Sequence, residues 1–405
     1  MKSQSWLKKG KWLGLTLGFL ISHPLMAAPP ELTPRQYEQL SNLGEALQEE
    51  RYEEVYERGY PLFERPRGNQ EQRAFVRAFV ARVLAQAYQQ QEDLVAATEI
   101  LQKSLKDAEY LDRQTLQALR WLLVQVYIGQ GDYQQALARL ESWWGDEEEP
   151  VADAHYLRAA LLGQLELWQE AEPWLLIALD LQEEHPDSWL ALAVAIYQQQ
   201  EDWSGAAEYQ AKRLEINPER PRLWVQLSQL QKLAGEDAEA LVTQELAMRR
   251  GYLNNREMER LGRELLQSGQ PLRAAKVFEV LLADQDEPEP SLLRLATQAW
   301  LQTSQPEDIA KALERLVKAT QETADWRRLA DWHYSQGHWE QALDAWTQLR
   351  PALEERERAQ VELLMANAHI ELANYSEARY LLEELLESSE ERAARQWLNY
   401  LDALN

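Results

Sequence analysis

The chain has 405 residues, of which 45% are apolar, 42 are basic and 67 are acidic, with a formal net charge of −25 and no cysteine. A chain this acidic repels phosphate backbones, which argues against nucleic acid as a partner. Without cysteine there is no disulfide, thiolate nucleophile, cysteine-rich metal site or cysteine-linked lipid.

The first 27 residues have the pattern of a secretory signal peptide. Four lysines lie between Lys2 and Lys11, and an apolar stretch of ten residues follows from Trp12 to Ile21. That stretch is too short to span about 30 Å of hydrocarbon as a helix, and the small residues around Ala27 offer a cleavage site. Cleavage there removes four lysines and no acid, which takes the formal charge from −25 to −29. The alternative is an uncleaved short anchor.

We therefore expect a mature protein of residues 28–405 in the periplasm. No later segment approaches the 18 consecutive apolar residues that indicate a membrane span, so no membrane insertion is expected after cleavage.

One unit recurs along the mature chain: an apolar helical stripe, a short polar turn with an aromatic residue, and a small residue opening a second stripe. Successive spacings of that small residue are 42 and 39, then 33 to 36, which predicts a repeat of about 34 residues. These phase-marker residues are Val55, Ala97, Ala136, Ala171, Ala206, Ala240, Ala274, Ile309, Ala342 and Ala378.

The spacing has a physical cause. A small side chain early in the second helix lets the two helices cross closely, and apolar positions three and four residues apart share one face. Glycines such as Gly131 and Gly337 are placed to end the first helix in the left-handed conformation. The stretch around Pro306 departs from the pattern, because it lacks the aromatic residue and has Ile309 at the small position.

These residues resemble the tetratricopeptide (TPR) pattern of tryptophan, leucine, small residue, tyrosine, alanine and proline at fixed offsets. The resemblance covers roughly residues 36–400. It implies an all-α fold: an α-solenoid of about ten helix-turn-helix repeats in a right-handed superhelix, formed by residues 28–405 as one continuous array. The first helix pair is expected at about residues 36–63 and a C-terminal capping helix at about residues 390–405.

Three loops are expected between helices. Residues 64–70 account for the long first spacing, and residues 145–150 and 284–290 form acidic loops that contain proline. We interpret the acidic loops as solvated connections between repeats, with a binding role as the alternative.

No motif for catalysis or a cofactor is present. The sequence has no glycine-rich phosphate loop, nucleophile elbow or zinc spacing. Asp331, His333 and His338 come nearest to a metal cluster, but His333 is expected on the inner face of a helix and His338 in a turn, pointing apart. We predict a binding scaffold without catalytic residues, metal or cofactor; the rival is a hydrolase whose catalytic residues lie on the solenoid.

In the family, the first helix of each repeat lines a concave surface. The corresponding positions are rich in arginine and glutamine, which suit hydrogen bonding to an extended peptide or a carboxylate of a protein partner. Ordinary solvated positions are the alternative. We call these residues the predicted face: Arg82, Gln86, Gln89, Trp121, Gln125, Tyr197, Gln229, Arg263, Gln267, Arg294, Gln298 and Arg327.

Two hypotheses concern the tryptophans. Six occupy packing positions of the repeat and are expected in the core: Trp168, Trp203, Trp224, Trp326, Trp339 and Trp346. Trp121, Trp143 and Trp144 are placed either in a contact patch or, as we favour, in core or partly buried packing.

Two segments carry a narrower resemblance. Residues 32–40 and 269–277 look like parts of the secreted tetratricopeptide protein that accompanies TonB energy-transduction systems of gammaproteobacteria, in which ExbB and ExbD harness the proton gradient. The resemblance implies an accessory that binds TonB-system proteins. The alternative is a scaffold for envelope polysaccharide export or for outer-membrane assembly machinery.

The predicted face leads to a first test. Replacing Arg263 and Arg294 together by glutamate is expected to weaken partner binding, because the positive charge of the face is reversed, while helicity and melting temperature stay unchanged. Calorimetric binding and circular dichroism measure the two effects, and an unaltered affinity would contradict the hypothesis.

Overall fold

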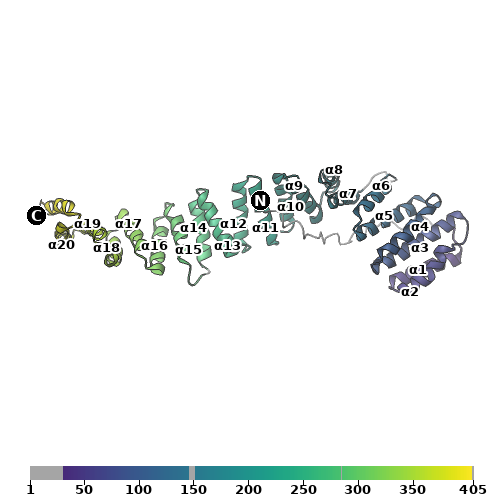
Figure 1. The fold of residues 1–405 in the computed structure, drawn as a ribbon, viewed down its shortest axis with the longest axis horizontal. Coiled ribbons are helices and arrows are strands. Elements are labelled where there is room, and N and C mark those ends of the chain that lie inside the picture. Colours follow the sequence, from purple (N-terminus) through teal and green to yellow (C-terminus); the bar gives the residue numbers. More distant parts are fainter. Residues whose placement is uncertain (1–30, 146–150, 284, 404–405) are drawn as a thin grey trace. The chain divides into compact units, whose positions relative to one another are not determined.

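The computed structural model describes residues 31–145, 151–283 and 285–403, and every regular element in these ranges is helical. The chain divides into two compact units, one ending at Gly235 and the other beginning at Glu236. Figure 1 shows successive helices lying side by side within each unit. The expected all-α solenoid of helix-turn-helix repeats is therefore confirmed. The expected signal peptide and residues 146–150 lie outside the described residues.

The N-terminal unit contains eleven described α-helices: α1 Pro34–Gln48, α2 Tyr52–Glu64, α3 Gln70–Gln90, α4 Leu94–Ser104, α5 Arg113–Gln130, α6 Tyr133–Trp144, α7 Ala152–Gln164, α8 Trp168–Asp180, α9 Asp187–Gln199, α10 Trp203–Ile216 and α11 Pro221–Leu233. A 3₁₀ helix, η1 Leu105–Tyr110, follows α4.

The C-terminal unit contains ten described α-helices: α12 Asp237–Arg249, α13 Asn255–Gln267, α14 Pro271–Ala283, α15 Pro290–Leu301, α16 Pro306–Thr320, α17 Thr323–Ser335, α18 Trp339–Leu349, α19 Glu355–Glu371, α20 Tyr375–Glu384 and α21 Glu391–Ala403. Two short 3₁₀ helices, η2 Arg350–Ala352 and η3 Leu385–Glu387, follow α18 and α20. No helix in the described ranges is long and apolar enough to cross a membrane.

The phase-marker residues occupy one structural position. Each is the fourth residue of an even-numbered helix, from Val55 in α2 to Ala378 in α20, and each is buried. A small side chain at this point lets the neighbouring helix approach closely, as the repeat period predicts. Ile309 is the most exposed of the ten, at 7%, at the place where the sequence pattern is weakest.

The turns before the even-numbered helices share one backbone geometry. Two residues before the helix, φ is positive in nine of the ten turns in the described part of the chain. Gly131 and Gly337 take this left-handed conformation at no steric cost, with φ of 73° and 74°. Where Glu92 or Ala373 stands instead, with φ of 61° and 59°, the side chain costs about 1–2 kcal/mol. The exception is the turn before α16, which is also the irregular stretch around Pro306.

Side-chain caps fix where several helices begin. Thr33, Asn69 and Asn254 each accept a hydrogen bond from the backbone N–H three residues later, and the glutamine or glutamate at that later position bonds back to the cap. These reciprocal bonds satisfy N–H groups that a helix N-terminus otherwise leaves unpaired. They also place the start of α1 and of α3 firmly, which matters for the pocket described below.

The predicted tryptophan core is confirmed in part. Trp224 and Trp346 are buried, whereas Trp168, Trp203, Trp326 and Trp339 are half-buried. A solenoid has a thin core, so a large indole packs one face on a neighbouring helix and leaves an edge near solvent.

Close packing of the first and second helices predicts opposite effects for two glycine variants. In α13, a Cβ at Gly262 would lie 2.6 Å from two ring carbons of Phe278 in α14. Gly262→Ala is expected to destabilise the C-terminal unit by about 1–3 kcal/mol because the core is overpacked.

Gly44→Ala in α1 is the matched control. No atom lies within 4 Å of the added Cβ, so the higher helix propensity of alanine should raise stability by about 1 kcal/mol. Urea unfolding followed by circular dichroism measures both variants. If Gly262→Ala were as stable as the parent, the close packing of Gly262 against Phe278 would be contradicted.

Candidate functional site

All twelve residues of the predicted face lie on odd-numbered helices, the first helices of the repeats. In the N-terminal unit they come from α3, α5, α9 and α11, and in the C-terminal unit from α13, α15 and α17. Their placement on first helices therefore follows the resemblance stated above. Their accessibility and charge differ among the twelve.

The glutamines provide the accessible part of the predicted face. Gln86, Gln229, Gln267 and Gln298 are exposed, and Gln89 and Gln125 are half-buried. An exposed amide offers both donors and an acceptor to an extended peptide backbone.

Three residues of the face in the N-terminal unit pack against other side chains. The Arg82 guanidinium lies 5.3 Å from the centre of the Phe79 ring, and burial lowers its pKa. The Trp121 ring centre lies 5.0 Å from that of Trp143, and Tyr197 stacks on Tyr209 of α10 at 5.4 Å. Trp121 and Tyr197 thus join neighbouring helices, Arg82 packs on a ring of its own helix, and all three are half-buried.

The arginines of the C-terminal unit are neutralised by carboxylates. Arg263 Nη2 lies 2.7 Å from Glu259 Oε1, one turn earlier in α13. Arg327 Nε lies 3.9 Å from Asp331 Oδ2, one turn later in α17. The carboxylates on this face therefore lie within reach of its guanidinium groups.

Arg294 has a structural partner. Its Nη2 atom lies 2.9 Å from Asp325 Oδ2 and 2.6 Å from Glu322 Oε2, which joins α15 to the start of α17. Asp325 is only 1% exposed, and Thr320 Oγ1 donates a second hydrogen bond to it at 3.0 Å. A buried carboxylate needs such partners, since burying an unpaired charge is costly.

The tryptophans at the end of α6 form packing rather than an open patch. Trp143 is 2% exposed and contacts Trp121 and Trp144. Trp144 in turn meets the rings of His155 and Trp174 edge-on at 4.6 and 5.5 Å, and Arg158 lies 4.0 Å from the centre of Trp174. The favoured interpretation of core or partly buried packing is confirmed.

The histidines of the C-terminal unit lie closer together than expected. His333 is buried in α17, and its ring centre lies 5.7 Å from that of His338, with Trp332 beside both. The expectation that the two rings point apart is wrong, because the turn after α17 folds His338 back over the helix. Burial and the neighbouring His338 lower the pKa of His333. No group of three or more metal-ligating side chains occurs in the described ranges.

A pocket of about 740 Å³ lies where α1 begins, α2 ends and α3 begins. We call it the arginine pocket, because Arg35, Arg65 and Arg67 line it and no aspartate or glutamate of the described residues does. Leu40, Leu62 and Val76 supply its apolar part. The volume is within the range of ligand pockets, about 300–1,000 Å³.

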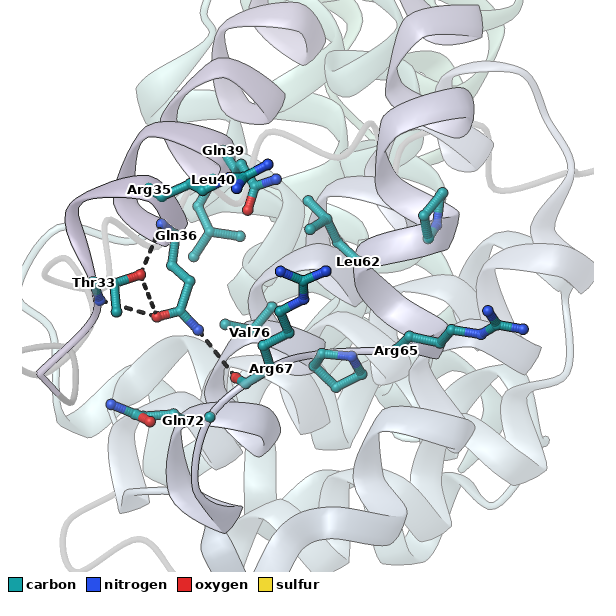
Figure 2. Close-up of a pocket in the computed structure, with 13 residues that line it drawn as sticks. Thr33, Arg35, Gln36, Gln39, Leu40, Leu62, Arg65, Arg67, Gln72 and Val76 are labelled. Atoms are coloured by element: carbon teal, nitrogen blue, oxygen red, sulfur yellow. Dashed lines mark hydrogen bonds between the residues drawn. The ribbon is translucent and has the colours of Figure 1, made fainter.

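Gln36 fixes one wall of the arginine pocket. Its Oε1 atom accepts hydrogen bonds of 2.9 Å from Thr33 N and Oγ1, and its Nε2 atom donates to the Arg67 carbonyl at 3.0 Å. Figure 2 shows the Thr33–Gln36 bonds at the start of α1 and the bond from Gln36 to Arg67 in the loop that follows α2. The loop and the helix start are thereby held at a set separation, with the arginine side chains free of this network.

The sequence predicts only a loop over residues 64–70 and gives Arg35, Arg65 and Arg67 no role. The local charge of the sequence could have indicated a basic site, because residues 65–82 contain five arginines and one acid, Glu71. The total charge conceals this excess, and only the packed helices bring Arg35 beside the loop.

No protein-family model and no curated protein matches the chain. Several solved structures match the chain at low sequence identity. A tetratricopeptide repeat protein from Parabacteroides merdae is 20% identical over 60% of this chain and 93% of its own, with a TM-score of 0.38. The C-terminal part of a TPR repeat-containing protein from Cytophaga hutchinsonii is 13% identical over 58% and 94%, with a TM-score of 0.35.

YrrB, described as a TPR protein with an unusual peptide-binding site, is 16% identical over 48% of this chain and 100% of its own, with a TM-score of 0.31. These TM-scores are low, so the fold assignment rests on the geometry already given: paired helices, buried phase markers and a shared turn. The chain is an all-α solenoid of tetratricopeptide-like helix pairs.

The ion pairs of Arg263 and Arg294 change the melting temperature expected when these two arginines are replaced. Arg294→Gln should lower the melting temperature of the C-terminal unit, because Asp325 is left buried with fewer partners. Arg263→Gln should leave it nearly unchanged, since exposed pairs one turn apart contribute little.

A double-mutant cycle with Asp325→Asn tests the cause. Arg294→Gln should cost much less in the Asp325→Asn background, because no buried charge then remains to be compensated. Thermal unfolding measures all four proteins. Equal losses in both backgrounds would show that Arg294 acts independently of Asp325.

Proposed function

We propose that this protein is an interaction scaffold of the tetratricopeptide type, which binds a segment of a partner protein along its first helices. The observation that carries the proposal is the set of exposed amides on first helices: Gln86, Gln229 and Gln298 at one repeat position, and Gln267 one turn further along its helix. Among the described residues no hydrogen bond occupies these four side chains. Exposed amides on first helices suit the repeating donors and acceptors of an extended backbone.

The proposal is for binding rather than catalysis. Two buried titratable groups illustrate this: Asp325 has structural partners, and His333 packs among aromatic rings. Neither arrangement combines an activated nucleophile with a base and an oxyanion site. The exposed amides by contrast need no activation to form hydrogen bonds.

We propose further that the protein works in the periplasm as an accessory of a TonB-type system. The basic and apolar pattern of residues 1–27 supports export, and the resemblance of residues 32–40 and 269–277 supports the TonB association. The competing proposal is a scaffold for polysaccharide export or outer-membrane assembly. Affinity purification from periplasmic extract separates the two: recovery of glycan-synthesis proteins alone would contradict the TonB association.

Photocrosslinking at single positions tests the scaffold proposal. A photoreactive residue at Gln229 in α11 or Gln298 in α15 is expected to give partner adducts in cells, because both side chains lie on the proposed binding face. The adducts are detected by immunoblotting and mass spectrometry.

Matched control positions are the exposed glutamines of second helices, Gln169 in α8 and Gln341 in α18. These should give few adducts. Equal yields at the two kinds of position, or adducts only at the controls, would overturn the assignment of binding to the first helices.

A further inference from the structure

The arginine pocket has a charge opposite to that of the chain. Three guanidinium groups and no carboxylate from the described part of the chain line it, in a protein whose formal charge is −25. Clustered positive charge in a concave site favours binding of an anionic group. The question is whether these guanidinium groups are available and what else the pocket recognises.

The three arginines are available for a ligand. Arg35, Arg65 and Arg67 are exposed, and none forms an ion pair with a carboxylate of the described residues. Arg263, Arg294 and Arg327 of the predicted face are by contrast all paired. A bound carboxylate would therefore meet guanidinium groups without first breaking an internal ion pair, and such charge-assisted bonds are among the stronger ones in proteins.

The pocket also has an apolar part. Leu40 is buried, and Leu62 and Val76 lie beside it, from three different helices. Figure 2 shows the Arg67 side chain between Gln36 and Leu62, while Arg65 extends away from Gln36. A ligand that carries both a carboxylate and an aliphatic side chain would use both parts, which points to a peptide rather than a free inorganic anion.

Long-range charge also favours a small ligand over a large one. Anionic membranes and polynucleotides present many charges, and the acidic remainder of the chain repels them over about a Debye length, 8–10 Å at physiological salt. A short peptide segment can enter the pocket and place its carboxylates within a few ångströms of the arginines, where attraction exceeds that repulsion.

The chain's own N-terminal segment does not have the required charge. Residues 1–30 contain four lysines and no acid. Glu31 approaches the pocket through its backbone, where its carbonyl accepts a hydrogen bond from Gln72. Residues 1–30 are therefore not the expected occupant.

The pocket is separate from the exposed amides. Gln72 lines it at the start of α3, and Gln86 lies fourteen residues further along the same helix. At 1.5 Å per residue the two are about 21 Å apart. The pocket thus forms a second subsite on the N-terminal unit.

We propose that the arginine pocket binds an acidic segment of a partner protein, with carboxylates on Arg35 and Arg67 and an aliphatic side chain against Leu40 and Leu62. The inference rests on the proposed scaffold function, of which it names the partner chemistry. It concerns a site that neither the repeat pattern nor the predicted face includes.

Fluorescence anisotropy tests the proposal with a defined probe: a fluorescein-labelled hexapeptide of alternating glutamate and leucine, and its glutamine–leucine counterpart. The full-length protein should bind the acidic peptide at least tenfold more tightly. Arg35→Gln combined with Arg67→Gln should weaken that binding by about tenfold or more, since each bond to a charged group contributes substantially.

The matched control is Arg249→Gln combined with Arg392→Gln. These arginines are also exposed, have no carboxylate partner among the described residues and lie outside the pocket. The control changes the net charge equally, so its affinity for the acidic peptide should stay within about twofold of the parent. Equal weakening in both variants would show a net-charge effect and overturn the proposal.

Two more outcomes count against the pocket. Equal affinity for the acidic and neutral peptides would exclude carboxylate recognition. Displacement of the peptide by inorganic phosphate at equal concentration would indicate a general oxyanion site without peptide specificity. Circular dichroism and melting temperature should match the parent in both variants, because all four arginines are exposed.

The photocrosslinking experiment separates this proposal from the scaffold function. Loss of peptide discrimination with adducts at Gln229 intact would overturn only the pocket. Specific peptide binding without adducts at Gln229 would overturn the first-helix face and leave the pocket standing.

Discussion

The structure depends on one recurring contact, the buried small residue at the fourth position of each even-numbered helix. There a side chain such as Ala171 or Ala240 is fully buried against the neighbouring helices, so the two backbones cross closely. A larger side chain there would force the helices apart. Because neither helix of a pair can bury its apolar face alone, this spacing also governs how well each repeat packs on the next.

The same close packing explains why many polar side chains have structural partners. Helices that cross closely bring side chains from different helices within bonding distance: Arg294 and Asp325 from different repeats, and Arg213 and Asp187 from one helix pair, both at 2.9 Å. Such pairs use the arginines that a sequence pattern would assign to ligand binding. Exposed side chains without a carboxylate in reach stay available to a partner, among them the amides of the first helices and the arginines of the pocket.

Much of the fold was predictable from local rules. The period of small residues located the second helices, and Gly131 and Gly337 marked turns that do adopt positive φ. For the predicted face, the sequence indicated which helices carry the residues but not which of the arginines are paired. The i,i+4 pair between Glu259 and Arg263 could be read from spacing, whereas the pair between Arg294 and Asp325, 31 residues apart, could not. The predicted direction of the His333 and His338 rings was wrong for a similar reason, because the path of the turn after α17 decides where His338 points.

The sequence by itself determined the repeat: its period, its small residues and its turns all follow from interactions between residues close along the chain. The tertiary structure decided which arginine side chains lack a carboxylate partner and can bind a ligand. The arginine pocket forms because the start of α1 lies against the loop after α2, joined by the hydrogen bond from Gln36 Nε2 to the Arg67 carbonyl. That juxtaposition gathers Arg35 and Arg67 from separate segments without a carboxylate between them. No local pattern encodes such a gathering, because it depends on distances between helices rather than on positions within one.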